Sequence, residues 1–167
     1  KASDTLRLGG NTVVSGTLEM LSGNMNTGVN TLTLGTSTAT TGTLSRSGGS
    51  IVGNFERWIS STGVDYLFPI GTSSYYRPVT VNFNALNGGS LIVSFNPSAP
   101  GNSGLPADDA GVNVVNTFVE GYWELTRANS LNSSDYNVDL TGNGFTTFPI
   151  IDATRIVSRA SSGADWT

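Results

Sequence analysis

The chain has 167 residues, 37% hydrophobic and only 12% charged, with eight basic residues against twelve acidic ones and a net charge of -4. It contains neither cysteine nor histidine, which excludes a disulfide framework, a thiolate zinc site and a Ser-His-Asp triad. The basic residues are scattered singly and no apolar run approaches the roughly 18 residues of a membrane-spanning helix, so nucleic-acid binding and a membrane span are disfavoured.

The first part of the chain repeats itself. Thr5–Asn30 aligns without gaps to Thr31–Glu56, and the shared words TLxLG and GTL fall in one register. A repeat of 26 residues that contains short alternating strands and turn glycines is typical of a β-solenoid in which each repeat is one coil. We therefore expect leucine to stack on leucine inside the coils and threonines to form ladders. The expected ladders are Thr5/Thr31, Thr12/Thr38 and Thr17/Thr43.

Two coils would leave both ends of the stack open. Because roughly three repeats are needed for a stable solenoid, we expect either further coils before Lys1 or another element that caps that end. At the other end Ile51–Ile59 loses the small residues of the repeat and gains large apolar ones, which indicates a capping segment. The sequence thus predicts solenoid coils with a cap over residues 1–62.

The repeat disappears from Gly63 onward, and longer alternating runs follow. The predicted strands are Tyr66–Ile70, Pro78–Phe83, Ser90–Phe95, Val112–Val119, Tyr122–Thr126, Tyr136–Leu140 and Arg155–Arg159. Asn87-Gly88-Gly89 lies between two cleanly alternating runs and predicts a β-hairpin. A further strand is expected to begin at Trp166. These features predict an antiparallel β-sandwich over residues 63–167 that lacks a strand at its C-terminal end. Either the chain continues and supplies that strand, or a partner does so by strand addition. The fold class expected for the whole chain is all-β.

The order of several short words resembles the large secreted surface proteins of Bacteroidota. In that group "G-x-L-x-R" β-helix coils lead into a β-sandwich marked by "FPxG…YRPV…W". The words in this chain are NTLTLG (30–35), GTL (42–44), GSIVGNFERWI (49–59), YLFPIGT (66–72), YYRPVTVNF (75–83), GYWELT (121–126) and DYNVDL (135–140). The resemblance implies export by a type 9 secretion system, a location outside the cell or on its surface, and a role as an adhesin or structural part.

Two sets of side chains are candidate sites. Asp108 and Asp109 are adjacent carboxylates in a loop and suit Ca²⁺, although a solvated loop is the plainer interpretation. Tyr75, Tyr76 and Trp123 could form a stacking platform for sugars, although aromatic residues of a sandwich more often pack in its core.

A third pair bears on catalysis. Glu120 and Glu124 would share one face of a strand and could serve as the acid and base of a glycosidase, or form a solvated face. Nothing else in the sequence indicates a sugar-cleaving cleft.

These observations favour a non-catalytic structural or adhesive segment of a long exported bacterial surface protein or extracellular fibre. Its expected partners are further segments of the same chain or identical subunits placed end to end, together with the secretion machinery and surface glycans. The alternative is a carbohydrate-binding accessory module of a secreted enzyme. No cofactor other than Ca²⁺ is expected.

Overall fold

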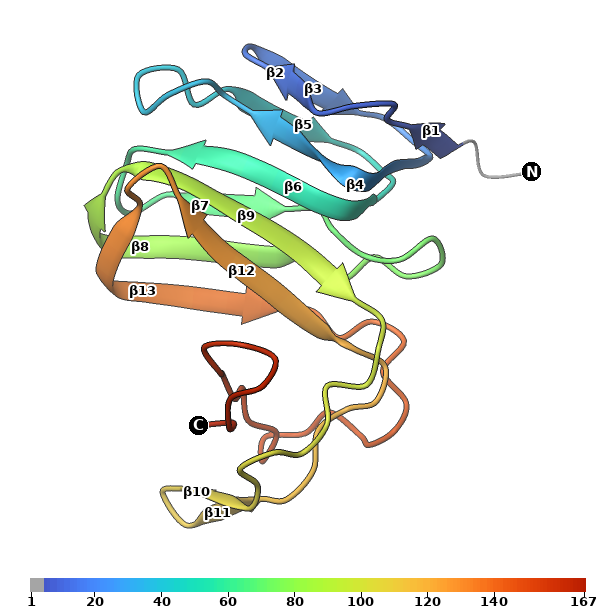
Figure 1. The fold of residues 1–167 in the computed structure, drawn as a ribbon, viewed down its shortest axis with the longest axis vertical. Helices are drawn as coiled ribbons and strands as arrows, with labels where there is room; N and C mark the ends of the chain where they lie inside the picture. Colours follow the sequence, from blue (N-terminus) through green and yellow to red (C-terminus); the bar gives the residue numbers. More distant parts are fainter. Residues whose placement is uncertain (1–4) are drawn as a thin grey trace. The chain divides into compact units, whose positions relative to one another are not determined.

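The protein is described from a computed structural model in which residues 5–167 are placed (Figure 1). This part of the chain is all-β, as predicted: it contains strands β1 to β13, arranged in several sheets, and no helix. It accordingly includes no helix that could cross a membrane. The start of the expected first domain, before Thr5, lies outside the described residues.

The largest sheet has six strands, in the order β1-β4-β6-β9-β12, with β2 also beside β4. Pairing is parallel from β1 and β2 through β4 to β6, and antiparallel between β6 and β9. The strands are β1 (Thr5–Arg7), β2 (Thr12–Val14), β4 (Asn24–Leu34), β6 (Ile51–Ile59), β9 (Gly89–Asn96) and β12 (Tyr122–Ala128).

Three smaller sheets account for the other strands. Two are pairs, β3 parallel to β5 and β10 antiparallel to β11, and the third is an antiparallel sheet in the order β13-β8-β7. The strands are β3 (Thr17–Met20), β5 (Thr43–Arg46), β7 (Asp65–Phe68), β8 (Val79–Asn87), β10 (Ala107–Asp109), β11 (Val112–Val114) and β13 (Asn132–Leu140).

The chain divides into two compact units. The first contains the chain up to Asn96 together with Trp123–Asn143, and the second contains Pro97–Tyr122 and Gly144–Thr167. The first unit holds both the parallel stack and the sandwich-like layers, so the expected boundary after residue 62 falls inside it. The second unit is mostly loop, and β10 and β11 are its short strands.

The parallel stack follows the predicted 26-residue register between β3 and β5 and at the start of the β4–β6 pairing, where Met25 pairs with Ile51 and Asn26 with Val52. Thr17 pairs with Thr43 and Leu18 with Leu44, as predicted. The other two threonine ladders are wrong, because Thr5 pairs with Asn24 and Thr12 with Leu32.

β4 bends, and its register with β6 changes at the bend. Gly28 there has a φ of 59°, and the pairing with β6 shifts register between Asn26 and Thr31. At the bend, the backbone N–H groups of Gly28 and Thr31 donate to the side chains of Asn26 and Asn11. Side chains therefore replace neighbouring strands as acceptors, which lets the coils differ in length.

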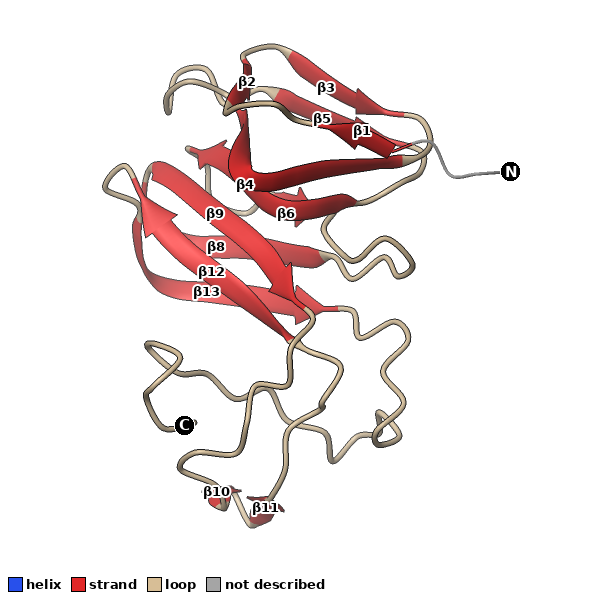
Figure 2. Ribbon diagram, turned by 45° about the vertical axis from the view of Figure 1, so that its right-hand side comes forward, coloured by secondary structure: helices blue, strands red, loops and turns tan. Residues whose placement is uncertain are grey.

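One apolar core runs through the first unit. Leu32, Phe55 and Val93 occupy neighbouring positions on β4, β6 and β9 and are buried. The ring of Phe55 meets that of Phe68 on β7 edge-on, with centroids 5.9 Å apart. This contact packs the large sheet against the β13-β8-β7 sheet, which gives the unit its sandwich-like character (Figure 2).

The predicted hairpin at Asn87-Gly88-Gly89 is wrong. β8 pairs with β7 and β13, whereas β9 pairs with β6 and β12, so the chain crosses between layers at this corner (Figure 2). A Cβ on Gly89 would clash with the backbone nitrogen of Leu131 and the backbone oxygen of Asn129. The alternating apolar residues of the two strands therefore face one core from opposite sides.

Predicted strands are shortened or absent in the second unit. Val112–Val119 forms a strand only over Val112–Val114, and Arg155–Arg159 forms none. Ser158 exchanges two backbone hydrogen bonds with Thr167, each 2.9 Å, but the pairing does not extend into a ladder. Ile156 and Val119 are 66% and 56% exposed, so no packed face holds these segments extended.

Candidate functional site

Tyr75 and Tyr76 lie in the loop between β7 and β8, which is closed by internal hydrogen bonds. Thr72 donates its backbone N–H to the carbonyl of Tyr75, and its hydroxyl accepts the N–H groups of Ser74 and Tyr75. Gly71 and Tyr76 form an isolated β-bridge across the loop. These hydrogen bonds therefore fix the backbone of the turn that carries the two tyrosines.

Tyr76 is covered by an arginine. The guanidinium carbon of Arg46 lies 3.6 Å from the centroid of the Tyr76 ring. Arg46 is held there by two hydrogen bonds to the carbonyl of Gly49, of 2.9 and 2.7 Å. Burial raises the pKa of the Tyr76 hydroxyl, and the positive charge of Arg46 opposes that rise. One face of this ring is thus occupied within the protein.

Tyr75 and Trp123 are brought to one cluster through Arg77. The Arg77 guanidinium lies 5.1 Å from the Tyr75 centroid and 4.5 Å from that of Phe95. Trp123 stands edge-on to Phe95 at 5.3 Å and donates its Nε1–H to the carbonyl of Arg77 at 2.9 Å. Tyr75 is 44% exposed whereas Trp123 is half-buried, so Tyr75 is the more accessible of the two rings. The cluster can offer aromatic stacking to a ligand.

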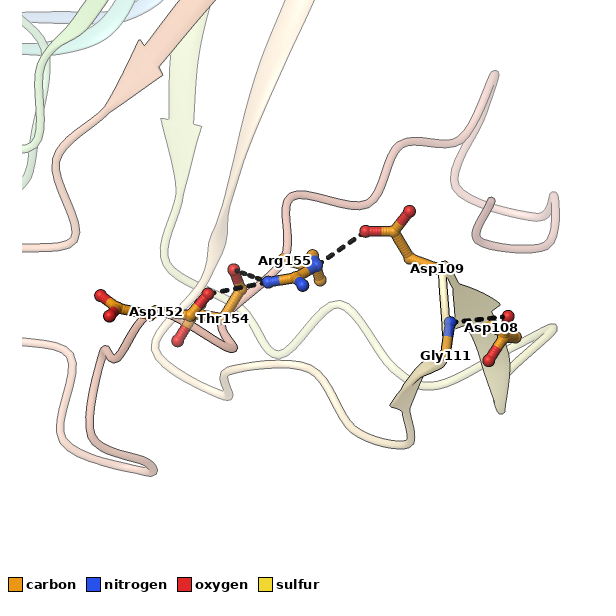
Figure 3. Close-up of polar contacts among 6 residues, drawn as sticks. All are labelled: Asp108, Asp109, Gly111, Asp152, Thr154 and Arg155. Carbon is orange, nitrogen blue, oxygen red and sulfur yellow. Dashed lines mark hydrogen bonds and ion pairs between the residues drawn. The ribbon is translucent and has the colours of Figure 1, made fainter.

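Asp108 and Asp109 lie on the short strand β10, where consecutive side chains point to opposite faces. Asp109 forms an ion pair with Nε of Arg155 at 2.7 Å (Figure 3). Arg155 also donates to the backbone oxygens of Asp152 and Thr154. Asp108 accepts the backbone N–H of Gly111 at 3.2 Å, which closes the β10–β11 turn.

A hollow of about 220 Å³ adjoins this pair, lined by Asp108, Asp109, Arg155, Thr167 and apolar neighbours. Ca²⁺ takes about six or more oxygen ligands. Within the described residues no three acidic, histidine or cysteine side chains gather. The guanidinium of Arg155 engages the Asp109 carboxylate, and the backbone N–H of Gly111 engages that of Asp108.

Glu120 and Glu124 do not form the expected same-face pair on a strand. β12 begins at Tyr122, and Gly121, with a φ of 130°, interrupts the alternation before it. Glu124 accepts a hydrogen bond from Ser94 at 3.4 Å.

The carboxylate of Glu120 is bound by a neighbouring turn. It accepts two backbone N–H groups, from Thr146 and Thr147, at 2.6 Å each, and both threonine hydroxyls. Desolvation raises its pKa, but the hydrogen bonds from Thr147 and Thr146 outweigh that effect and bring it to about 2. Such a group is ionised at neutral pH and is unsuited to act as a general acid.

Sequence reasoning missed the outer face of the β13-β8-β7 sheet. Asp65 on β7 and Asp135 and Asp139 on β13 lie on this face, which we call the acidic face. Strand alternation places them there, because Tyr66, Tyr136 and Val138 between them face the core partners Val81 and Phe83. The sequence signal that could have revealed this face is the pair Asp135 and Asp139, four residues apart in an alternating strand.

Comparison of the chain with protein-family models, curated proteins and solved structures gives no match.

Proposed function

We propose that the chain is a stiff, non-catalytic structural or adhesive segment of a long exported bacterial surface protein. The observation that supports this most is the double pairing of β6, parallel to β4 on one side and antiparallel to β9 on the other. Through β6 the hydrogen-bonded stack and the sandwich-like layers share one sheet. A sheet without a break transmits force along its whole length.

In this proposal the strands β1 to β6 are the last coils of a β-solenoid. Leu6, Met25 and Ile51 form one inward column in it. The column goes from fully buried at Ile51 to 58% exposed at Leu6. A further coil, from the same long chain or from an identical subunit placed end to end, would cover Leu6 and pair with β1.

An added coil tests this proposal. A duplicate of Asn24–Gly49 placed ahead of Thr5 should stack on β1, raise the melting temperature and slow amide exchange in β1. A scrambled insert of the same composition is the control. If the duplicate leaves β1 exchange and the melting temperature unchanged, the coils do not propagate.

The proposed location is the surface of a Bacteroidota cell, reached through the type 9 secretion machinery. The resemblance of the sequence words supports it. An antibody against the chain should label intact cells of the source organism, and protease added outside the cells should remove the label. Labelling only after lysis would contradict it.

A second candidate is a carbohydrate-binding module, favoured by the exposed side chain of Tyr75 beside Arg77 and Trp123. On a glycan array, hits should be lost in the Tyr75→Ala variant and kept in Tyr136→Ala, which removes an exposed tyrosine elsewhere. Hits that survive Tyr75→Ala would rule out this cluster as the binding site.

A further inference from the structure

The acidic face has no basic residue of its own. The three strands β7, β8 and β13 carry Asp65, Asp135 and Asp139 and contain neither lysine nor arginine. Two of these carboxylates accept hydrogen bonds from side-chain amides: Asn82 donates to Asp65 at 2.7 Å, and Asn84 donates to Asp135 at 3.1 Å. Neutral donors orient the carboxylates but leave their charges uncompensated.

β13 is an edge strand. Within residues 5–167, β8 is its one strand neighbour. Along it Asp135, Asn137 and Asp139 are exposed on the outer face. On the inner face Tyr136 is 56% exposed although its ring lies 6.2 Å from that of Phe83. The edge therefore presents backbone hydrogen-bonding groups, an apolar inner side and an acidic outer side.

This pattern selects among possible partners. If β13 paired with β13 of a second copy, aspartates would line both strands with no basic residue between them, and like charges across a strand pair are destabilising. Charged residues on an edge strand commonly block such self-association. A strand of opposite charge would instead gain cross-strand ion pairs along the same edge. The charges therefore disfavour another β13 edge and favour a basic strand.

We propose that the β13 edge is a docking site for an extended, basic segment of another polypeptide. That segment alternates apolar with Arg or Lys residues and adds to the sheet as a fourth strand. Its apolar side chains would cover Tyr136, and two of its basic side chains would lie opposite Asp135 and Asp139. These aspartates are about 13 Å apart at the rise of a strand, which matches basic residues four positions apart. The proposal stands independently of the structural role proposed above.

The test uses a labelled nine-residue peptide of alternating Val and Arg, titrated with the whole chain at low ionic strength. Binding is followed by fluorescence anisotropy. We expect the Asp135→Asn/Asp139→Asn double variant to bind roughly two- to thirtyfold more weakly, the effect of two cross-strand ion pairs. Asp152→Asn, in the second unit, is the matched control and should bind as the wild type does. A peptide with Glu in place of Arg should not bind.

Strand addition is separated from simple charge attraction by a second peptide. The same Val/Arg sequence with alternate backbone nitrogens methylated keeps its charges but cannot pair with an edge. We expect it to bind more weakly and to give no amide-exchange protection in β13. Equal binding by both peptides would overturn the proposed edge, as would equal binding by wild type and the double variant. Circular dichroism establishes that each variant is folded before it is scored.

Discussion

Glu120 shows how one carboxylate can organise a loop-rich region. Its two oxygens accept hydrogen bonds from the backbone and hydroxyls of Thr146 and Thr147. In the same unit Phe118 packs against Phe145 and Phe148, with centroids 5.1 and 5.5 Å apart. The second unit has few buried apolar side chains among its described residues, Trp166 being one, so such polar anchors matter there.

Lowering the pH should weaken the hydrogen bonds that the Glu120 carboxylate accepts from Thr146 and Thr147. Because the folded pKa of about 2 lies below the ordinary value of 4.5, the carboxylate stabilises the fold above about pH 4.5. That contribution is lost as the pH falls from 4.5 to 2. We expect Glu120→Gln to be less stable than the wild type at pH 7 and to lose part of the acid dependence. Tryptophan fluorescence in urea titrations at several pH values measures this.

Glu124→Gln is the control for the acid experiment, because the hydrogen bond that Glu124 accepts from Ser94 is long, at 3.4 Å. It should retain the acid dependence of the wild type. If the stability of Glu120→Gln had the same pH dependence as that of the wild type, the hydrogen bonds of the Glu120 carboxylate would contribute nothing to stability.

Strand pairs in the first unit are joined by corners that change layer. β6 leads to β7, β8 to β9 and β12 to β13, and each pair has one strand in each sheet. The order β6, β9, β12 in one sheet therefore matches β7, β8, β13 in the other. At the corner after β8 the backbone passes so close to Asn129 and Leu131 that a side chain has no room.

Gly89→Ala tests this corner. The added methyl group meets backbone atoms that cannot rotate away, so we expect a loss of about 1–3 kcal/mol of unfolding free energy. Gly9→Ala is the control, since a Cβ there would meet nothing within 4 Å and should change stability by less than about 0.5 kcal/mol. Urea denaturation followed by circular dichroism compares the two. Equal stability of the two variants would contradict the close approach.

The whole first unit depends on a core shared by the stack and the sandwich-like layers. Phe55 is fully buried, pairs laterally with Leu32 and Val93, and contacts Phe68 across the layers. Its position makes it the side chain that joins the two halves.

We expect Phe55→Ala to cost about 3–5 kcal/mol, the usual penalty for emptying a phenylalanine site. Amide exchange should accelerate together in β4 and in β9, because both strands pack on this ring. Val29→Ala is the control, since Val29 is 96% exposed. Acceleration confined to β9 would show that the parallel stack has an independent core.

Local patterns predicted the strands of the first unit well. Alternation in Val79–Phe83 and Leu91–Phe95 identified the buried face of each strand, and the GTL word identified the Thr17/Thr43 pairing. The aromatic candidates were predicted as a group, but the structure separates Tyr76, under Arg46, from Tyr75 and Trp123 beside Arg77.

The sequence by itself therefore determined the all-β class and the faces of the strands, because side-chain alternation is a property of each strand alone. Only the tertiary structure decided which strands pair, that β8 and β9 part into two layers, and that Arg57 lies buried in the core with Nη1 donating to the carbonyl of Leu67. Partner choice depends on the corners and on contacts between distant segments, and no local period encodes those.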